Sequence, residues 1–297
     1  MSDKQNLKRW ATYAAVATAL TLIVIKLAAW VATGSIALLS TLIDSLLDAG
    51  ASVVNLVAVR QALQPADRDH RFGHGKAEPL AGLAQAAFVA GSGLFLVIEA
   101  AGRFAEPQTV TRPLIGVVVM AVSIVLTLIL VVFQKFVVKK TKSVAVDADS
   151  LHYTGDVLIN LSVIASLLLT SQLGFALADP LFAILIALYL LWNALGIARS
   201  SMDHLMDREF PGTERDRIKQ IARTHPGVMN VHDLRTRSSG TQGFIQLHLE
   251  LDGQLPLVEA HAIADAVELK LREAFPEAEV IIHQDPAGLA EPHQIFK

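Results

Sequence analysis

Six apolar segments, each long enough to cross a lipid bilayer, constrain this chain more than any other feature of its sequence. They cover residues 10–33, 36–59, 79–102, 113–135, 144–171 and 178–198. A membrane-spanning helix needs about 20 apolar residues. Only 18% of the 297 residues are charged and 53% are hydrophobic, whereas soluble domains carry about 25% charged residues. We therefore expect an α-helical membrane protein with six transmembrane helices.

The basic residues of the loops predict the orientation of these helices. One side of the membrane would carry Lys4, Lys8, Arg9, Arg60, Arg68, Arg71, Lys76, Lys135, Lys139, Lys140, Lys142 and Arg199. The other side would carry only Arg103 and Arg112. Because cytoplasmic loops are enriched in Lys and Arg, we expect both termini in the cytoplasm. Lys26 lies near the far end of the first segment, from which its long side chain could extend to the interface.

The last 91 residues have the composition of a soluble domain. Residues 1–206 hold 15 Lys and Arg against 13 Asp and Glu, and residues 207–297 hold 10 against 15. This acidic balance argues against a nucleic-acid partner. The patterns predict a helix in ERDRIKQIARTH, strands in NVHDLRTR and GFIQLHLELD, a helix in LPLVEAHAIADAVELKLREAF and a strand in EVIIHQD. We expect a transmembrane domain over 1–206 and, over 207–297, a cytoplasmic α+β domain of order α-β-β-α-β, ferredoxin- or metallochaperone-like.

Four ionisable residues stand inside two of the apolar segments. Asp44 and Asp48 are four residues apart, and so are His152 and Asp156, so each pair lies on one face of its helix. At about 1.5 Å per residue, Asp48 lies roughly 18 Å from the outer surface and His152 about 12 Å from the inner one. In a hydrocarbon core of about 30 Å these depths coincide. The sequence therefore predicts that the four side chains meet near the membrane midplane.

Three carboxylates and one imidazole suit a tetrahedral divalent cation such as Zn²⁺. The chain has no cysteine, so thiolate ligands are excluded. Because clustered carboxylates also bind protons, metal and protons should compete for the same atoms, which is the basis of an antiporter. A buried polar network that only joins two helices, and a pathway for protons alone, are the alternatives. An intramembrane metalloprotease is disfavoured because the chain has no HExxH motif. We expect a transporter rather than an enzyme, with zinc and no organic cofactor.

Two further acidic residues precede this group in DADSLHYTGD. Asp147 and Asp149 are nearer the cytoplasmic edge of the segment. They could attract cations to the entrance, or they could lie on a solvated helix face.

Several motifs together resemble the cation diffusion facilitator family over nearly the whole chain. They are TLIDSLLDA, PADRDHRFGHGKAEPLA, DADSLHYTGD, LMDREF, VHDLRTR and IIHQDP. The resemblance implies a homodimer in the bacterial inner membrane that exchanges cytoplasmic Zn²⁺ or Cd²⁺, and also Fe²⁺, for protons by alternating access. The family's transport site falls on Asp44, Asp48, His152 and Asp156, and Leu151 matches a hydrophobic gate residue.

The resemblance implies two more metal sites. The first lies in a loop, at Asp67, His70 and His74; from the residues alone this is equally a solvated polar loop. The second is a two-zinc centre at His232, His248, His261, His283 and Asp285, with Asp285 as the bridge. For this site the spacing of the residues agrees with the resemblance, because His283 and Asp285 lie two residues apart on one strand face, and His248 alternates with apolar neighbours.

Two further features of the family concern assembly and signalling. Lys76 and Asp207 match a charge pair that interlocks the two protomers. The tail site would either sense zinc or stabilise the dimer, and the sequence leaves both open. A zinc-sensing membrane scaffold without transport is the alternative function.

Overall fold

The computed structural model describes residues 3–34, 36–105, 114–173, 177–239 and 242–288. Its helices and strands are α1 (Asp3–Thr33), α2 (Ile36–Ala62), α3 (Ala77–Ala105), α4 (Leu114–Thr141), α5 (Val144–Leu173), α6 (Ala178–Leu205), α7 (Gly212–Arg223), β1 (Asn230–Ser238), β2 (Gly243–Leu251), α8 (Leu257–Ala274) and β3 (Ala278–Pro286). They form two compact units, 1–66 with 76–202 and 67–75 with 203–297. The loop 67–75 thus groups with the C-terminal residues. Arg112 and the side chain of Arg103 lie outside the described part.

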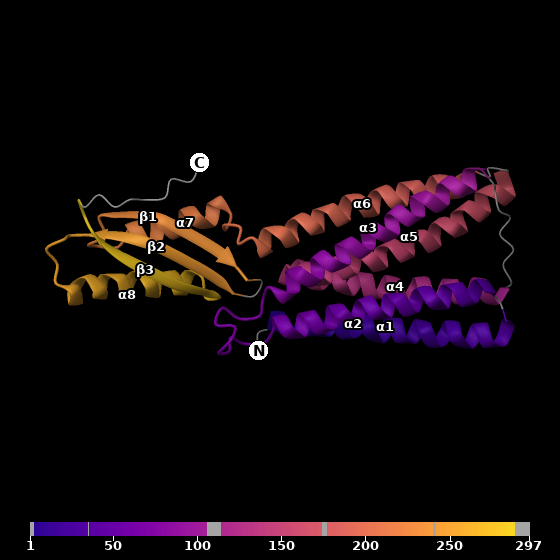
Figure 1. The fold of residues 1–297 in the computed structure, drawn as a ribbon, viewed down its shortest axis with the longest axis horizontal. Coiled ribbons are helices and arrows are strands. Elements are labelled where there is room, and N and C mark those ends of the chain that lie inside the picture. The colour runs from indigo at the N-terminus through magenta and orange to yellow at the C-terminus, as the bar shows by residue number, and fades with distance from the viewer. Residues whose placement is uncertain (1–2, 35, 106–113, 174–176, 240–241, 289–297) are drawn as a thin grey trace. The chain divides into compact units, whose positions relative to one another are not determined.

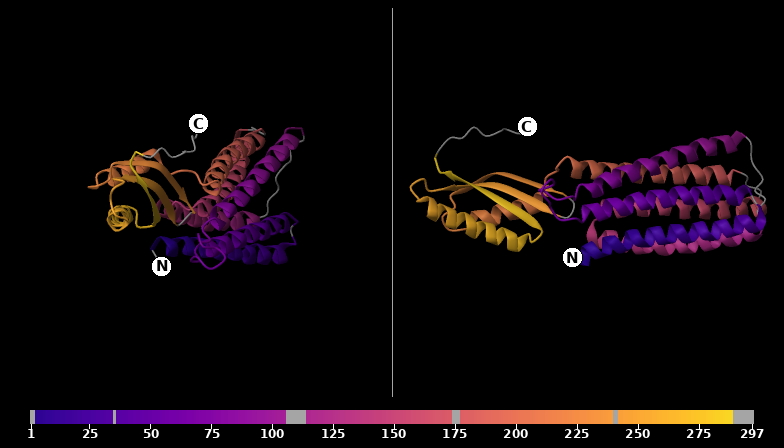
Figure 2. Two further views of the ribbon diagram at one scale, coloured as in Figure 1. Left: turned by 60° about the vertical axis from the view of Figure 1, so that its left-hand side comes forward. Right: turned by 60° about the horizontal axis from the view of Figure 1, so that its bottom comes forward.

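The first unit is a helical transmembrane domain made of α1 to α6, which run side by side (Figures 1 and 2). Within the described residues, five of these helices are long and apolar enough to cross a membrane, and α5 is not among those five. The described part of α5 differs because its first half carries Asp147, Asp149, His152 and Asp156. Large apolar side chains such as Trp192 and Val31 are exposed on the flanks of the unit, as expected for a surface that faces lipid.

Small residues allow α1 to approach its neighbours. Ala11 packs with residues of α4 and α5, Ala15 packs with Leu130 and Tyr153, and Ala29 packs with residues of α2 and α4. In a bilayer the hydrophobic effect does not drive helices together, so close backbone packing at small residues has this role.

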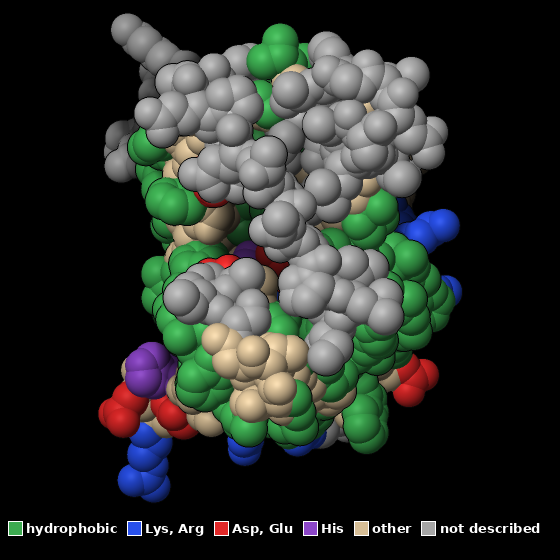
Figure 3. All heavy atoms as spheres, turned by 90° about the vertical axis from the view of Figure 1, so that its right-hand side faces the viewer, with side chains coloured by type: hydrophobic (Ala, Val, Ile, Leu, Met, Phe, Trp, Pro, Cys, Tyr) green, Lys and Arg blue, Asp and Glu red, His purple; other side chains and the backbone are tan. Residues whose placement is uncertain are grey.

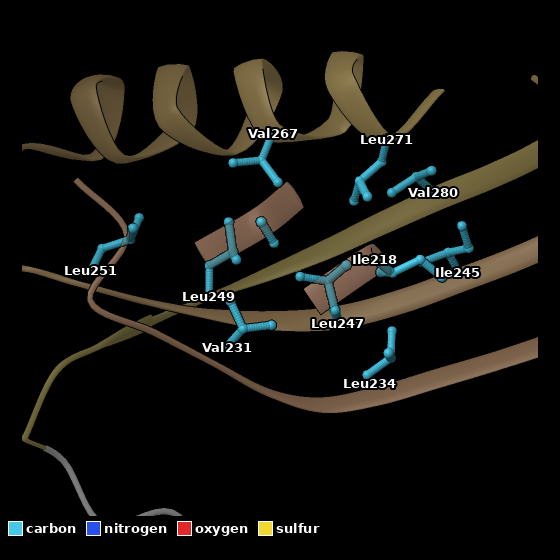
Figure 4. Close-up of a cluster of buried hydrophobic side chains, with 11 residues drawn as sticks. Ile218, Val231, Leu234, Ile245, Leu247, Leu249, Leu251, Val267, Leu271 and Val280 are labelled. Atoms are coloured by element: carbon cyan, nitrogen blue, oxygen red, sulfur yellow. The ribbon is translucent and has the colours of Figure 1, made fainter. Parts of the chain in front are cut away.

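The C-terminal unit is a two-layer α+β domain, as the sequence predicts. Its sheet has the order β1-β2-β3, in which β1 and β2 are antiparallel and β2 and β3 are parallel. A parallel pair needs a crossover connection, and α8 provides it. Figure 4 shows Val267 and Leu271 of α8 pointing toward the sheet, into a core that also contains Leu247 and Leu249 of β2. Because successive strand residues point to opposite faces, His248 lies on the face away from this core.

The loop 67–75 packs against the sheet of this unit. The guanidinium group of Arg237 lies 4.7 Å from the ring centre of Phe72 and 4.8 Å from that of Phe244. The two rings meet edge to face at 5.6 Å. A Cβ atom at Gly75 would lie 1.5 Å from the carbonyl oxygen of Ser239, so only glycine fits this contact.

Candidate metal centres

The helices α2 and α5 bring three of the four predicted intramembrane ligands together. The ligand atoms of Asp48, His152 and Asp156 all lie within 4.8 Å of one another. Nε2 of His152 is 3.0 Å from Oδ1 of Asp48 and 3.8 Å from Oδ2 of Asp156. Asp44 lies one turn before Asp48 and outside this group, with an exposed side chain. The four-residue spacing therefore brings His152 and Asp156 together on α5, but on α2 it does not bring Asp44 into contact with the group that contains Asp48.

The surroundings of His152 fix the orientation of its ring. Phe88 meets the imidazole ring edge to face at 5.4 Å. The hydroxyl groups of Ser52 and Tyr153 are 2.7 Å apart, which ties α2 to α5 next to the site. Leu151 is buried among residues of α3, α5 and α6, and its role as a gate stays a prediction.

Two polar residues in this unit differ from the sequence interpretation. Lys26 does not extend to the interface, because its ammonium group donates hydrogen bonds to Ser45 Oγ (2.6 Å) and to the carbonyl oxygen of Thr41 (3.1 Å). Asp149 is fully buried and accepts a hydrogen bond from Gln134 (2.6 Å), so it lies neither at an open entrance nor on a solvated face. Asp147 does face solvent, 3.4 Å from Lys135. A buried aspartate within an apolar segment has no signal of its own in the sequence.

The loop residues Asp67, His70 and His74 form a second cluster, with ligand atoms within 4.8 Å of one another. Asp67 is 3.5 Å from Nδ1 of His70 and 3.3 Å from Nε2 of His74. Its Oδ1 atom also accepts hydrogen bonds from the backbone N–H groups of His70 (2.7 Å) and Asp69 (2.9 Å). The bond from His70 is the main reason why the pKa of Asp67 lies below its usual value. The turn thus presents a charged carboxylate beside two imidazoles.

The third cluster lies on the open face of the sheet in the C-terminal unit. His232 pairs with His248 across β1 and β2, and His248 pairs with His283 across β2 and β3, so the three imidazoles form a row. Asp285 is 5% exposed and lies 3.2, 2.8 and 3.0 Å from His232, His248 and His283. One buried carboxylate therefore contacts three imidazoles.

Two residues near this row were not expected, and one expected residue lies apart. Glu250 is 3.0 Å from Nδ1 of His232, and Asp233 is 3.8 Å from Nε2 of His248. A hydrogen bond from Arg235 holds the pKa of Asp233 below its usual range. Glu250 follows His248 by two residues, a spacing that could have indicated it. His261 is exposed on α8, pairs with Asp265 at 3.5 Å and is not in the cluster.

The two members of the predicted charge pair belong to different units. Lys76 begins the second segment of the membrane unit. Asp207 lies in the C-terminal unit, where its carboxylate is 3.6 Å from Arg237. The pair between protomers stays a prediction.

Comparison with known proteins identifies the family. Residues 12–206 match the cation efflux transmembrane domain. The chain belongs to the cation efflux family. Residues 210–287 match the family's cytoplasmic domain. The resemblance inferred from the motifs is thus confirmed, and the chain is a multi-pass membrane transporter for cations rather than an enzyme.

Curated members of the cation efflux family are similar over almost the whole chain. The cation-efflux pump FieF of Shewanella oneidensis is 52% identical over 276 residues, which are 93% of each chain. FieF of Serratia proteamaculans is 48% identical over 96% of this chain and 94% of its own. Within the family, the motifs are similar to those of the bacterial zinc/proton antiporter YiiP, also called the ferrous-iron efflux pump.

A solved structure is also similar to the C-terminal unit. It is the metal-bound C-terminal domain of the CzcD transporter from Thermotoga maritima, 30% identical, which covers 28% of this chain and all of its own with a TM-score of 0.26.

Proposed function

We propose that this protein exports Zn²⁺ from the cytoplasm in exchange for protons, with Cd²⁺ and Fe²⁺ as further substrates. The transport site consists of Asp44, Asp48, His152 and Asp156. The observation that carries the proposal is the convergence of Asp48, His152 and Asp156 from two helices of the transmembrane domain. Ionisable residues within a membrane are costly and commonly mark ion pathways.

The geometry supports a tetrahedral cation. Two ligand atoms that are each about 2.1 Å from a tetrahedral zinc ion lie about 3.4 Å from each other. The separations from His152 Nε2 to Asp48 and to Asp156 are 3.0 and 3.8 Å, on either side of that value. Small side-chain rotations would therefore create the site. Asp44, one turn from Asp48 on the same helix, supplies the fourth ligand after a rotamer change.

Competition between metal and proton follows from the same atoms. When Nε2 of His152 carries a proton, it donates to Asp48 Oδ1 at 3.0 Å. A metal ion bound to both atoms has to displace that proton, because each lone pair serves one partner at a time. Loading the site with metal therefore releases protons, and protonation releases metal. A proton gradient directed inward then drives metal outward.

The burial of the site supports an arrangement open toward the outer ends of the helices. The side chains of Asp48 and Asp156 are 20% and 33% exposed, whereas that of His152 is 7% exposed. Figure 3 looks onto the helix ends opposite the termini of the unit, and acidic and histidine atoms are visible deep between the helices. Toward the cytoplasmic ends, Ala148 and Leu151 are buried. Leu151 would separate the site from the cytoplasm, and alternating access would reverse this arrangement.

The loop and tail clusters serve regulation and assembly in this proposal. The donor set of His232, His248, His283 and Asp285 fits zinc, which binds imidazole and carboxylate ligands, and Asp285 is placed to bridge two ions. A zinc ion bound there would neutralise the buried carboxylate and hold the three strands together. We further propose that the protein is an inner-membrane homodimer with cytoplasmic termini, joined through the tails and through Lys76 and Asp207.

The test is zinc flux in sealed proteoliposomes under an imposed pH gradient. The wild type should move zinc with a counterflow of protons, and Asp48→Ala and Asp156→Ala should abolish both fluxes. Asp147→Asn, which changes an exposed carboxylate on the same helix, is the matched control. Unchanged transport in Asp156→Ala would refute the assigned site. Zinc binding without zinc movement in the wild type would instead favour a zinc-sensing scaffold.

A further inference from the structure

A second buried polar group lies outside the metal-ligating cluster, around Asp149. Asp149 and Gln134 are both 0% exposed, and Asn55 is 3% exposed. They come from α5, α4 and α2. Nε2 of Gln134 donates to Oδ2 of Asp149 at 2.6 Å. Ser52 and Asn55 of α2 approach the same carboxyl group as hydrogen-bond donors. Burying polar side chains costs free energy, so a group of them outside the transport site indicates a function or a structural role.

This group has more acceptors than donors. The amide of Asn55 donates to the carbonyl oxygen of Ala145, and that of Gln134 donates to Asp149, which fixes the orientation of both amides. Asn55 Oδ1 and Gln134 Oε1 are therefore buried acceptors without a hydrogen bond from any described residue, and Asp149 Oδ1 has no well-formed hydrogen bond although Ser52 and Asn55 approach the carboxyl group as donors. Buried acceptors are rarely left in this condition. A proton on Asp149 would turn one of the three acceptors into a donor.

The group is adjacent to the transport site. Asp149 precedes His152 by three residues, so the two side chains lie on neighbouring positions of one helix face, and they interact electrostatically. Of the other groups that act on Asp149, Gln134 comes from α4 and Ser52 and Asn55 come from α2. Tyr153 is a further titratable side chain that interacts with Asp149. On α1 and α3, Lys8 and Glu78 are paired with each other at 2.7 Å.

We propose that Asp149 is a proton-carrying residue of the exchange cycle, which holds a proton while the transport site is free of metal and releases it when metal binds. The inference rests on the proposed function. Replacing one proton on His152 by a divalent cation adds one positive charge next to Asp149, in surroundings that screen charge weakly. The added charge drives the proton of Asp149 out to cytoplasmic water. By linkage, a protonated Asp149 weakens metal binding to the same extent, and the proton returns when the metal leaves.

The experiment compares full-length wild type with Asp149→Asn in proteoliposomes, recording zinc and protons together. Asparagine keeps the shape and a donor for the group, but it cannot change its charge. Zinc transport should persist, with a loss of about one proton per zinc ion and a flatter pH profile. Asp147→Asn should leave ratio and profile unchanged. Gln134→Leu removes the donor to the carboxylate and should move the profile to higher pH.

A second measurement covers the case in which Asp149→Asn does not transport. The infrared difference spectrum between zinc-bound and zinc-free wild type should show the loss of a protonated-carboxyl band, and Asp149→Asn should lack that change. The inference is overturned if the variant keeps the wild-type ratio and pH profile, or if its infrared change equals that of the wild type. If the wild type itself exchanges no protons for zinc, the proposed function fails first.

Discussion

The aromatic contact that holds the loop 67–75 on the sheet should determine how tightly the proposed loop site binds metal. Phe72→Leu keeps an apolar side chain of similar size but removes the ring that Arg237 and Phe244 contact. An exposed cation–π contact contributes about 0.5–1 kcal/mol, and an aromatic pair contributes about 0.5–1.5 kcal/mol. Because Phe72 is 54% exposed, we take the lower half of the summed range, about 1–1.75 kcal/mol.

The contact of Phe72 with Arg237 and Phe244 keeps the loop ordered before metal binds. Asp67, His70 and His74 flank Phe72 on both sides, so releasing the ring adds the cost of reordering the loop to metal binding. A cost of about 1.4 kcal/mol is a tenfold loss of affinity. The assay is calorimetric zinc titration of protein whose tail site is disabled by Asp285→Asn. Phe72→Tyr keeps the ring and is the control. Equal affinity in Phe72→Leu and Phe72→Tyr would refute the argument.

Two other substitutions test the effect of charge, one at the transport site and one in the loop 67–75. Lys26→Met removes an ammonium group that interacts with Asp44, Asp48 and Asp156. Zinc should therefore bind the transport site several-fold more tightly and leave it more slowly. Slower zinc binding with unchanged zinc release in a flux assay would contradict this expectation. Asp67→Asn should loosen the loop turn at neutral pH. The lowered pKa of Asp67 means that its stabilising effect is present above the unfolded value of about 3.9 and is lost as pH falls through the folded value. Exchange protection of the His70 amide should therefore differ between wild type and variant at pH 7 and converge in strong acid.

The sequence predicts the fold well where periodicity decides it. The membrane helices follow from apolar length, and the C-terminal unit follows from alternation such as Leu247, His248 and Leu249. The pairing of charged side chains is harder to predict. Glu250 and Asp285 approach the histidine row only because of strand register, and His261 lies apart because its position on α8 faces solvent.

The burial of individual polar side chains in the membrane unit is also hard to predict from the sequence. Asp149 and Asp147 differ by two residues in one motif, yet one is enclosed and the other is exposed. The difference depends on where Gln134 and Asn55 approach from other helices. Hydropathy along a single segment contains no information about such neighbours.

The row formed by His232, His248 and His283 has a consequence for how the sheet assembles. If β3 slipped by one residue along β2, Ile282 and Gln284 would occupy the open face, and His283 would turn into the core, because strand side chains alternate with a period of two. Only the native alignment places the three imidazoles and the Asp285 carboxylate together on the open face. A metal ion bound at the proposed tail site would therefore stabilise the native alignment of β3 on β2 over the slipped one.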